Sequence, residues 1–380
     1  MSDVRATPSP GTFDAPIGLL EPTGADRQGI GVQPPRDPHD PGPPSGRWAA
    51  TALASSPLSA ATRSLTGAGV DVAVIDTGVH PVPGLDDPDK VVRSGPRGPS
   101  TIADGHGHGT VMAGLVAGSV HGVAADARIV DVRVADDGGA AGSDSVAAGL
   151  RWLIEHGRSS GLDVRIALAA FDDGAADPDD GAELLAAIEQ ARRAGIAVLV
   201  GAGDRGTDGD RLTGPARAAG AIVVSATTAS GEVAPWARRG DRDRSVDAYV
   251  PGSRLLAPIH PGALIARSAP AAVGEVDGVL AIRGSGTSHA AALAAGVAAR
   301  MLEASPWMGP NQLRRQLTRW AGARASNSWT SNSWTSNSWT SNSWTSNSWT
   351  SNSWTSNSWT SNSWTSNSWT SNSWTSNSWT

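Results

Sequence analysis

Short apolar runs that alternate with helical patterns restrict most strongly how this chain can fold. Each run is bounded by turn-forming residues, which is typical of a buried strand. Strands that alternate with helices predict an α/β domain of three layers, with a mainly parallel sheet between helices. The expected strands are 70–75, 128–134, 164–170, 196–203, 221–226 and 247–252, and the expected helices begin near 108 and 286 and cover 143–157, 182–195 and 311–320.

The two ends of the chain lack this alternation. Residues 1–47 are rich in Pro, Gly and Asp, and residues 326–380 are eleven copies of SNSWT. A Trp at every fifth position fits neither the helix nor the strand period, so we expect a disordered array, with an adhesive Trp-based tail as the alternative. We therefore predict a disordered leader over 1–47, one folded domain over 48–324 and a low-complexity repeat tail over 326–380.

Composition excludes several classes of function. The net charge is -6, Lys90 is the only lysine, and no basic stripe is interleaved with aromatic residues, so nucleic-acid binding is not expected. The chain has no cysteine, which excludes disulfides, thiolate catalysis and cysteine-based zinc sites. We see no apolar segment long enough to span a membrane and no signal peptide at the start. The oligomeric state stays open.

Three residues with complementary chemistry stand at the ends of expected elements. Asp76 follows an apolar strand in IDTG, His108 begins a small-residue helix in DGHGHGTVMAG, and Ser288 begins an alanine-rich helix in GSGTSHAAALAAGVAA. Ligands of parallel sheets bind beyond the carboxyl ends of the strands, so these residues can face one crevice. Acyl transfer needs a hydroxyl nucleophile, an imidazole base and a carboxylate that orients the imidazole. The sequence supplies one of each.

Each of these residues also has a purely structural interpretation. Asp76 fits a turn, His108 a helix cap, and Thr287 or Ser288 an N-cap. A metal pair formed by His106 and His108 is disfavoured, because Asp76 is the only evident third ligand. We therefore expect no metal site here.

Three sequence blocks resemble the signature blocks of the subtilisin-like (S8) serine peptidases. They are AVIDTGV (73–79), GHGTVMAGLVAG (107–118) and SGTSHAA (285–291), and they occur in the family's order. The segments ARIVDVRVADDGG and VDAYVPG resemble the family's connecting segments, and the likeness extends from about Ser64 to Trp320. The lead-in SLTGAGVDVAVIDTGV together with HGTVMAG further resembles the actinobacterial mycosin-like branch.

The resemblance implies a serine endopeptidase that acts on peptide or protein substrates without a cofactor. Ser288 would be the nucleophile, His108 the base and Asp76 its orienting partner, and the Ser288 N–H would be one oxyanion donor. Structural calcium is compatible with the resemblance, although the sequence identifies no site. Export is the family's habit. The substrate-binding positions would be Ala169, Ala170 and Phe171 in one segment and Ala202 and Gly203 in the pocket wall.

Several positions depart from the family pattern. Asp204 stands in GAGDRG where the family pattern AAGNxG has an asparagine that donates to the oxyanion. An ionised carboxylate cannot donate, so the expected oxyanion hole is atypical unless burial keeps Asp204 protonated. Phe171 replaces a glycine of the substrate-binding segment, and Pro215 matches a family turn whose proline can be cis. A weakly active or inactive relative that binds peptides is the alternative function, and an esterase-like acyl hydrolase is a more remote one.

Overall fold

The structure is a computed structural model that describes residues 64–96, 104–118, 122–159, 161–170, 181–204 and 209–333, with side chains described as far as Ala321. Internal contacts divide the chain into two units, Met1–Gly322 and Ala323–Thr380. The first unit holds the whole α/β fold. The described part of the second unit, residues 323–333, is helical. The predicted leader over 1–47 lies outside the described residues, as does the array beyond residue 333.

A parallel sheet of seven strands forms the centre of the first unit. The chain places β2 and β3 on one side of β1 and then continues with β4 on the other side, so the strand order reverses beside β1. Ligand sites of open α/β sheets form at such reversal points. The strands, in the order in which they lie, are β2 (Val91–Arg93), β3 (Arg128–Arg133), β1 (Asp71–Asp76), β4 (Val164–Leu168), β5 (Ala197–Gly201), β6 (Ile222–Thr227) and β7 (Ala248–Pro251).

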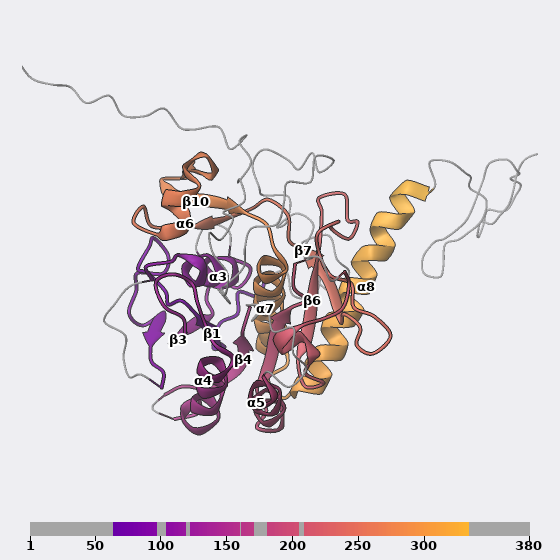
Figure 1. Cartoon of the computed structure of the whole chain (residues 1–380), viewed down its shortest axis with the longest axis horizontal. Helices are drawn as coiled ribbons and strands as arrows, with labels where there is room; N and C mark the ends of the chain where they lie inside the picture. Colours follow the sequence, from indigo (N-terminus) through magenta and orange to yellow (C-terminus); the bar gives the residue numbers. More distant parts are fainter. Residues whose placement is uncertain are drawn as a thin grey trace, which may run out of the picture. The chain divides into compact units, whose positions relative to one another are not determined.

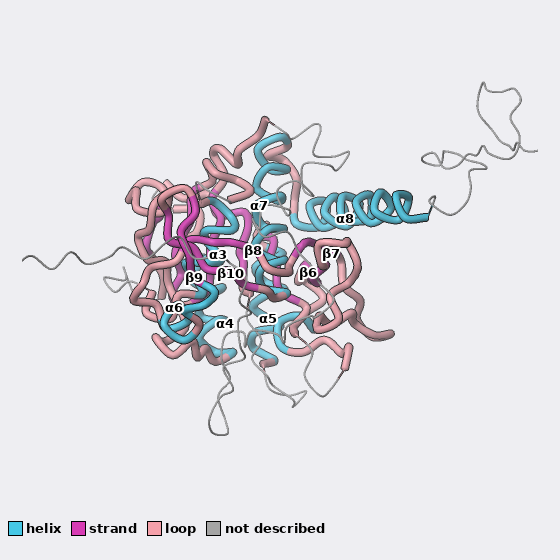
Figure 2. The backbone as a smooth tube through the Cα atoms, turned by 90° about the horizontal axis from the view of Figure 1, so that it is seen from above, coloured by secondary structure: helices cyan, strands magenta, loops and turns pink. Residues whose placement is uncertain are grey.

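Helices cover both faces of this sheet (Figures 1 and 2). Helices α3 (His108–Ala117) and α7 (Thr287–Ala304) pack on one face, and α4 (Ser143–His156) and α5 (Ala182–Arg193) pack on the other. Strand β1 contributes alternate residues to both cores, because successive side chains of a strand point to opposite faces. Val72 and Val74 join the core beneath α3 and α7, and Ala73 and Ile75 join the other. The predicted three-layer α/β fold is confirmed.

A second, antiparallel sheet was not predicted. Strands β8 (Leu255–Pro258), β9 (Val273–Val276) and β10 (Val279–Gly284) pair in the order β8-β10-β9. These strands are short, and β9 is only partly buried, so the sequence gives no strong alternation there. Strand β10 leads directly into α7 and thereby sets where Ser288 lies. The short elements α6 (Leu264–Ser268), η1 (Gly214–Arg217) and η2 (Pro270–Ala272) complete the unit.

The closing helix is longer than the sequence predicted. Helix α8 spans Pro310–Ser333 and therefore includes the first eight residues of the SNSWT array, 326–333. Its first part is anchored by Leu313, Leu317 and Trp320, which are at most 1% exposed and recur at helical spacing. Once a helix is nucleated, each added residue needs little further stabilisation, so a segment without helical periodicity can extend it.

The expectation for Pro215 is wrong. No peptide bond among the described residues is cis, and Pro215 lies in the first turn of η1. A trans proline suits that turn, because its fixed φ matches the helix start and its missing N–H would have no partner there. Gly214 takes the positive φ of 48° that the entry to this turn requires. Within the described residues, no helix combines the length and apolar composition that a membrane crossing needs.

Candidate active site

Asp76 and His108 form a buried carboxylate–imidazole pair. Asp76 is the last residue of β1 and His108 the first residue of α3, and both side chains are nearly inaccessible to solvent. Nδ1 of His108 lies 3.0 Å from each carboxylate oxygen of Asp76. Burial acts to lower the pKa of His108, but the charge and hydrogen bond of Asp76 outweigh it and leave that pKa raised. The carboxylate therefore stabilises the imidazolium and fixes the Nδ1–H tautomer.

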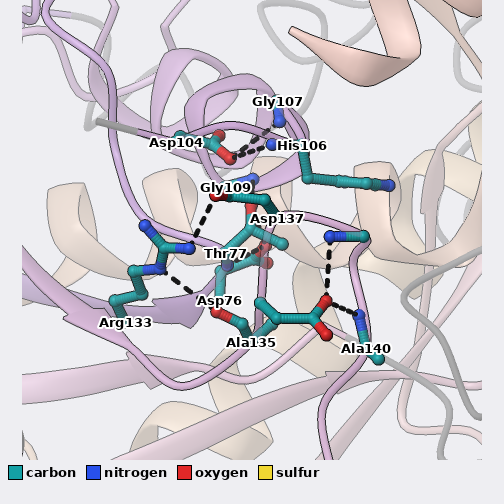
Figure 3. Close-up of polar contacts among 12 residues, drawn as sticks. Asp76, Thr77, Asp104, His106, Gly107, Gly109, Arg133, Ala135, Asp137 and Ala140 are labelled. Carbon is teal, nitrogen blue, oxygen red and sulfur yellow. Dashed lines mark hydrogen bonds and ion pairs between the residues drawn. The ribbon is translucent and has the colours of Figure 1, made fainter. Parts of the chain in front are cut away.

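The loop before α3 is organised around a second buried carboxylate, Asp104. Its Oδ1 accepts hydrogen bonds from the N–H groups of His106 and Gly107, and its Oδ2 accepts from both the N–H and the hydroxyl of Thr110. Figure 3 shows the carboxylate directed at the two loop nitrogens. Asp104 thus satisfies donors at the start of α3 and fixes where His108 enters the site.

Ser288 completes a continuous chain of contacts. Its Oγ lies 3.3 Å from Nε2 of His108, on the side of the ring opposite Asp76. Ser288 is the second residue of α7, which packs directly against α3. The N-cap of α7 is Gly286, and no side chain of its own segment caps the helix. The structure therefore does not support the interpretation of Thr287 or Ser288 as a simple N-cap.

Two hydrogen bonds link Asp204 and its neighbour Gly203 to Thr287 in the first turn of α7. Oδ1 of Asp204 accepts the N–H of Thr287 at 3.0 Å, and the hydroxyl of Thr287 accepts the N–H of Gly203 at 3.1 Å. A carboxylate at a helix N-terminus interacts favourably with the helix dipole. Asp204 also contributes to raising the pKa of His108. The residue that the sequence placed in the oxyanion hole therefore lies at the start of the helix that carries Ser288.

The positions predicted to bind substrate are only partly described. Ala169 and Ala170 follow β4 and Ala202 and Gly203 follow β5, and all four are buried. Ala169 and Ala202 belong to the core beneath α4 and α5, and Ala170 belongs to the opposite core. Phe171 lies outside the described residues. The role of these positions in substrate binding stays a prediction.

Besides Asp104, sequence reasoning missed two groups near Asp76, His108 and Ser288. His289 follows Ser288, and its Nδ1 lies 3.3 Å from the same Oγ that His108 contacts. Asp131 on β3 is buried, and its Oδ2 accepts the N–H of Val79, three residues after Asp76. The only signal for His289 was its place beside Ser288 in SGTSHAA. Asp131 gave no signal of its own, because it lies within an apolar run that predicts a strand. Among the described side chains, no group of three potential ligands is placed to hold a metal ion.

Comparison with known proteins relates this chain to one family. Residues 67–333 match the family model Peptidase_S8, described as the subtilase family. The chain is 30% identical over 279 residues to Subtilisin Savinase of Lederbergia lenta, with 71% of this chain and 90% of the relative covered. It is 29% identical to the serine protease AprX of Bacillus subtilis (strain 168), with 67% of this chain and 62% of the relative covered.

The fold is also similar to a solved structure described as a cold adapted subtilisin-like serine proteinase. The TM-score is 0.55 at 27% identity, with 67% of this chain and 83% of that chain covered. The alignment spans 52% to 63% of the length of several curated relatives. The finer resemblance to the mycosin-like branch stays a prediction. Since the family model covers most of the chain and the sheet and helices have the expected arrangement, the chain belongs to the subtilase family.

Proposed function

We propose that this protein is a serine endopeptidase that hydrolyses peptide bonds through an acyl-enzyme. Membership of the subtilase family supports a peptidase that uses a serine nucleophile. The observation that carries the proposal is the unbroken line of contacts from Asp76 through His108 to Ser288, at 3.0 Å and 3.3 Å. A hydroxyl, an imidazole and a carboxylate in that order are the parts that acyl transfer requires.

The reaction follows from these contacts. Ser288 Oγ attacks the scissile carbonyl carbon while its proton moves to Nε2 of His108, and Asp76 stabilises the imidazolium that forms. His108 then gives the proton to the leaving amine, which leaves an acyl group on Ser288. A water molecule attacks this ester, His108 takes its proton, and the same proton returns to Ser288 Oγ as the acid product departs.

Oxyanion stabilisation is the weak part of the proposed site. The N–H of Ser288 would supply one donor at the positive end of α7. Asp204 stands where an amide donor is expected, and an ionised carboxylate would repel a developing oxyanion. We therefore propose an atypical oxyanion hole and a turnover below that of a site with an amide at position 204.

A fluorophosphonate probe tests the proposal directly, because it reacts only with an activated serine. We expect labelling of the full chain at Ser288 that disappears in Ser288→Ala and persists in Ser285→Ala. Ser285 is a matched control in the same motif, since its Oγ accepts the N–H of Arg254 and contacts no triad member in the described residues. Labelling that survives Ser288→Ala would disprove the proposed nucleophile.

Asp204 also favours a second candidate, a peptide-binding relative with little or no turnover. Its carboxylate already satisfies the N–H of Thr287, so the first turn of α7 has an internal anion. This candidate predicts that peptides bind to wild type and to Ser288→Ala equally, and that no serine is labelled between pH 5 and pH 10. Cleavage of a denatured protein substrate by wild type alone would exclude it.

A further inference from the structure

A second imidazole contacts the hydroxyl of Ser288. Nδ1 of His289 lies 3.3 Å from Ser288 Oγ, the same distance that separates this oxygen from Nε2 of His108. The rings of His108 and His289 meet edge to face, with centroids 6.5 Å apart and planes at 80°. The hydroxyl of Ser288 therefore lies between two imidazole nitrogens that approach it from different directions.

His289 stays neutral wherever His108 can work as a base. Its side chain is buried, and burial together with the nearby His108 lowers its pKa to about 3. The pKa of His108 is raised instead, because Asp76 stabilises its charged form. The pKa values of the two rings that contact Ser288 are thus shifted in opposite directions, and His289 does not compete with His108 for a proton.

The proton positions follow from the partners of each nitrogen. The Asp76 carboxylate only accepts hydrogen bonds, so Nδ1 of neutral His108 carries its proton and Nε2 is an acceptor. The Ser288 hydroxyl then donates to Nε2, which leaves an oxygen lone pair facing Nδ1 of His289. An unprotonated Nδ1 would oppose that lone pair with its own, whereas a protonated Nδ1 donates to it.

We propose that His289 is a positioning residue for the nucleophile, whose Nδ1–H donates to Ser288 Oγ and directs the hydroxyl proton at His108. This inference rests on the proposed function. After attack, Oγ is bonded to the substrate carbon and still has two lone pairs, so it accepts from His289 and from the protonated His108 together. When the acyl-enzyme breaks down, the donor from His289 stabilises the departing Oγ until His108 returns its proton.

The glycines of the GSGTSH segment leave room for this imidazole. A Cβ at Gly284 would stand 2.3 Å from Nε2 of His289. A Cβ at Gly286 would stand 3.1 Å from both Nδ1 of His289 and Oγ of Ser288. Larger residues at these positions would displace the ring, so the backbone is shaped around the His289 side chain as well as around Ser288.

Two amide substitutions separate positioning from packing. The side-chain amide of Asn reaches the place of Nδ1, whereas that of Gln reaches the place of Nε2. We expect His289→Gln and the apolar His289→Leu to lower kcat and the rate of fluorophosphonate labelling about tenfold, the effect of one hydrogen bond, with KM unchanged. We expect His289→Asn to stay within about threefold of wild type.

The possible outcomes decide between distinct explanations. Equal losses of kcat in all three variants, at unchanged unfolding temperature, would show that His289 has only a packing role. Faster labelling in His289→Leu would show that His289 holds the hydroxyl away from His108. Either result overturns the inference. The proton on His289 is read independently from ring nitrogen NMR shifts of the wild-type protein. We expect the Nδ1–H tautomer, and an Nε2–H tautomer overturns the inference. A wild-type protein that is unlabelled and inactive, yet shows the Nδ1–H tautomer, would disprove the proposed function and leave the contact intact.

Discussion

The backbone N–H of Thr287 donates to Oδ1 of Asp204 at 3.0 Å, so this carboxylate is bound to the helix that carries Ser288. Asp204→Asn keeps this acceptor, since the amide oxygen can replace Oδ1, and it replaces Oδ2 with an N–H donor. An oxyanion donor of this kind is worth about 10²–10³-fold in turnover. We therefore expect Asp204→Asn to raise kcat by about 10²-fold at neutral pH, measured with a chromogenic peptide.

The matched variant is Asp204→Ala, which removes both the repulsion and the acceptor for Thr287. We expect it to lose about 1 kcal/mol of stability, as for the loss of a helix N-cap, and to gain less activity than Asp204→Asn. An unchanged kcat in Asp204→Asn would mean that Asp204 does not face the oxyanion.

Asp76→Asn should impair His108 through both its tautomer and its pKa. Burial acts to lower the pKa of His108, and Asp76 opposes it more strongly than Asp104 and Asp204 do, so the removal of the Asp76 charge lowers that pKa. His108 must be neutral to act as base, and activity therefore rises as pH rises through its pKa. We expect kcat to fall about 10⁴-fold and the acidic limb of kcat/KM against pH to move to lower pH.

The control for this variant is Asp137→Asn, which removes an exposed carboxylate that pairs with Arg133. We expect its pH profile to match that of wild type. An acidic limb that does not move in Asp76→Asn would show that another group sets it.

Gly109→Ala tests how closely β1 and α3 approach each other. A Cβ at Gly109 would lie 2.1 Å from the carbonyl oxygen of Gly78 and 3.1 Å from Cβ of Asp76. We expect a loss of several kcal/mol in urea unfolding and no labelling of Ser288. Gly142→Ala is the comparison, because nothing lies within 4 Å of the added Cβ, and its stability should stay within about 0.5 kcal/mol of wild type. Equal effects of the two substitutions would contradict this packing.

Asp131→Asn should stabilise the protein at alkaline pH. Burial raises the pKa of Asp131 from 3.8 to about 7, and its Oδ1 has no partner among the described residues. Between these values the folded state holds a proton that the unfolded state releases, so this group makes stability fall as pH rises. We expect Asp131→Asn to gain on the order of 4 kcal/mol at pH 8 and little at pH 4, measured by urea unfolding. A gain that is equal at both pH values would exclude titration of Asp131 as its cause.

The fold was largely predictable because its strands are apolar on both faces. Strand β1 shows why, since Val74 and Ile75 enter opposite cores and leave no polar alternation. The small sheet was not predictable in this way, because β8 ends in Pro258 and β9 is partly exposed. Strand β2 has only three residues, too few to show a period.

The candidate site was predictable as a set of residues but not as a geometry. Asp76, His108 and Ser288 stand in recognisable motifs at element ends, and the fold brings them together. The contacts of Asp104, Asp131 and His289 depend on how loops and strands pack, and the hydrophobic periodicity of the sequence does not predict that packing. Whether the peptide bond before Pro215 is cis or trans likewise depends on the turn that contains it.

All ten residues of helix α3 are buried, and this has one more consequence. At Gly114, six residues after His108 and about 9 Å further along the axis, an added methyl group would stand 2.4 Å from Cδ of Pro258. A helix enclosed on every side cannot turn the added methyl group toward solvent, so either α3 or the end of β8 must shift. A shift of α3 would move the imidazole at its first residue away from the serine hydroxyl, so a substitution at the far end of the helix can abolish the proposed activity while Asp76, His108 and Ser288 are all still present.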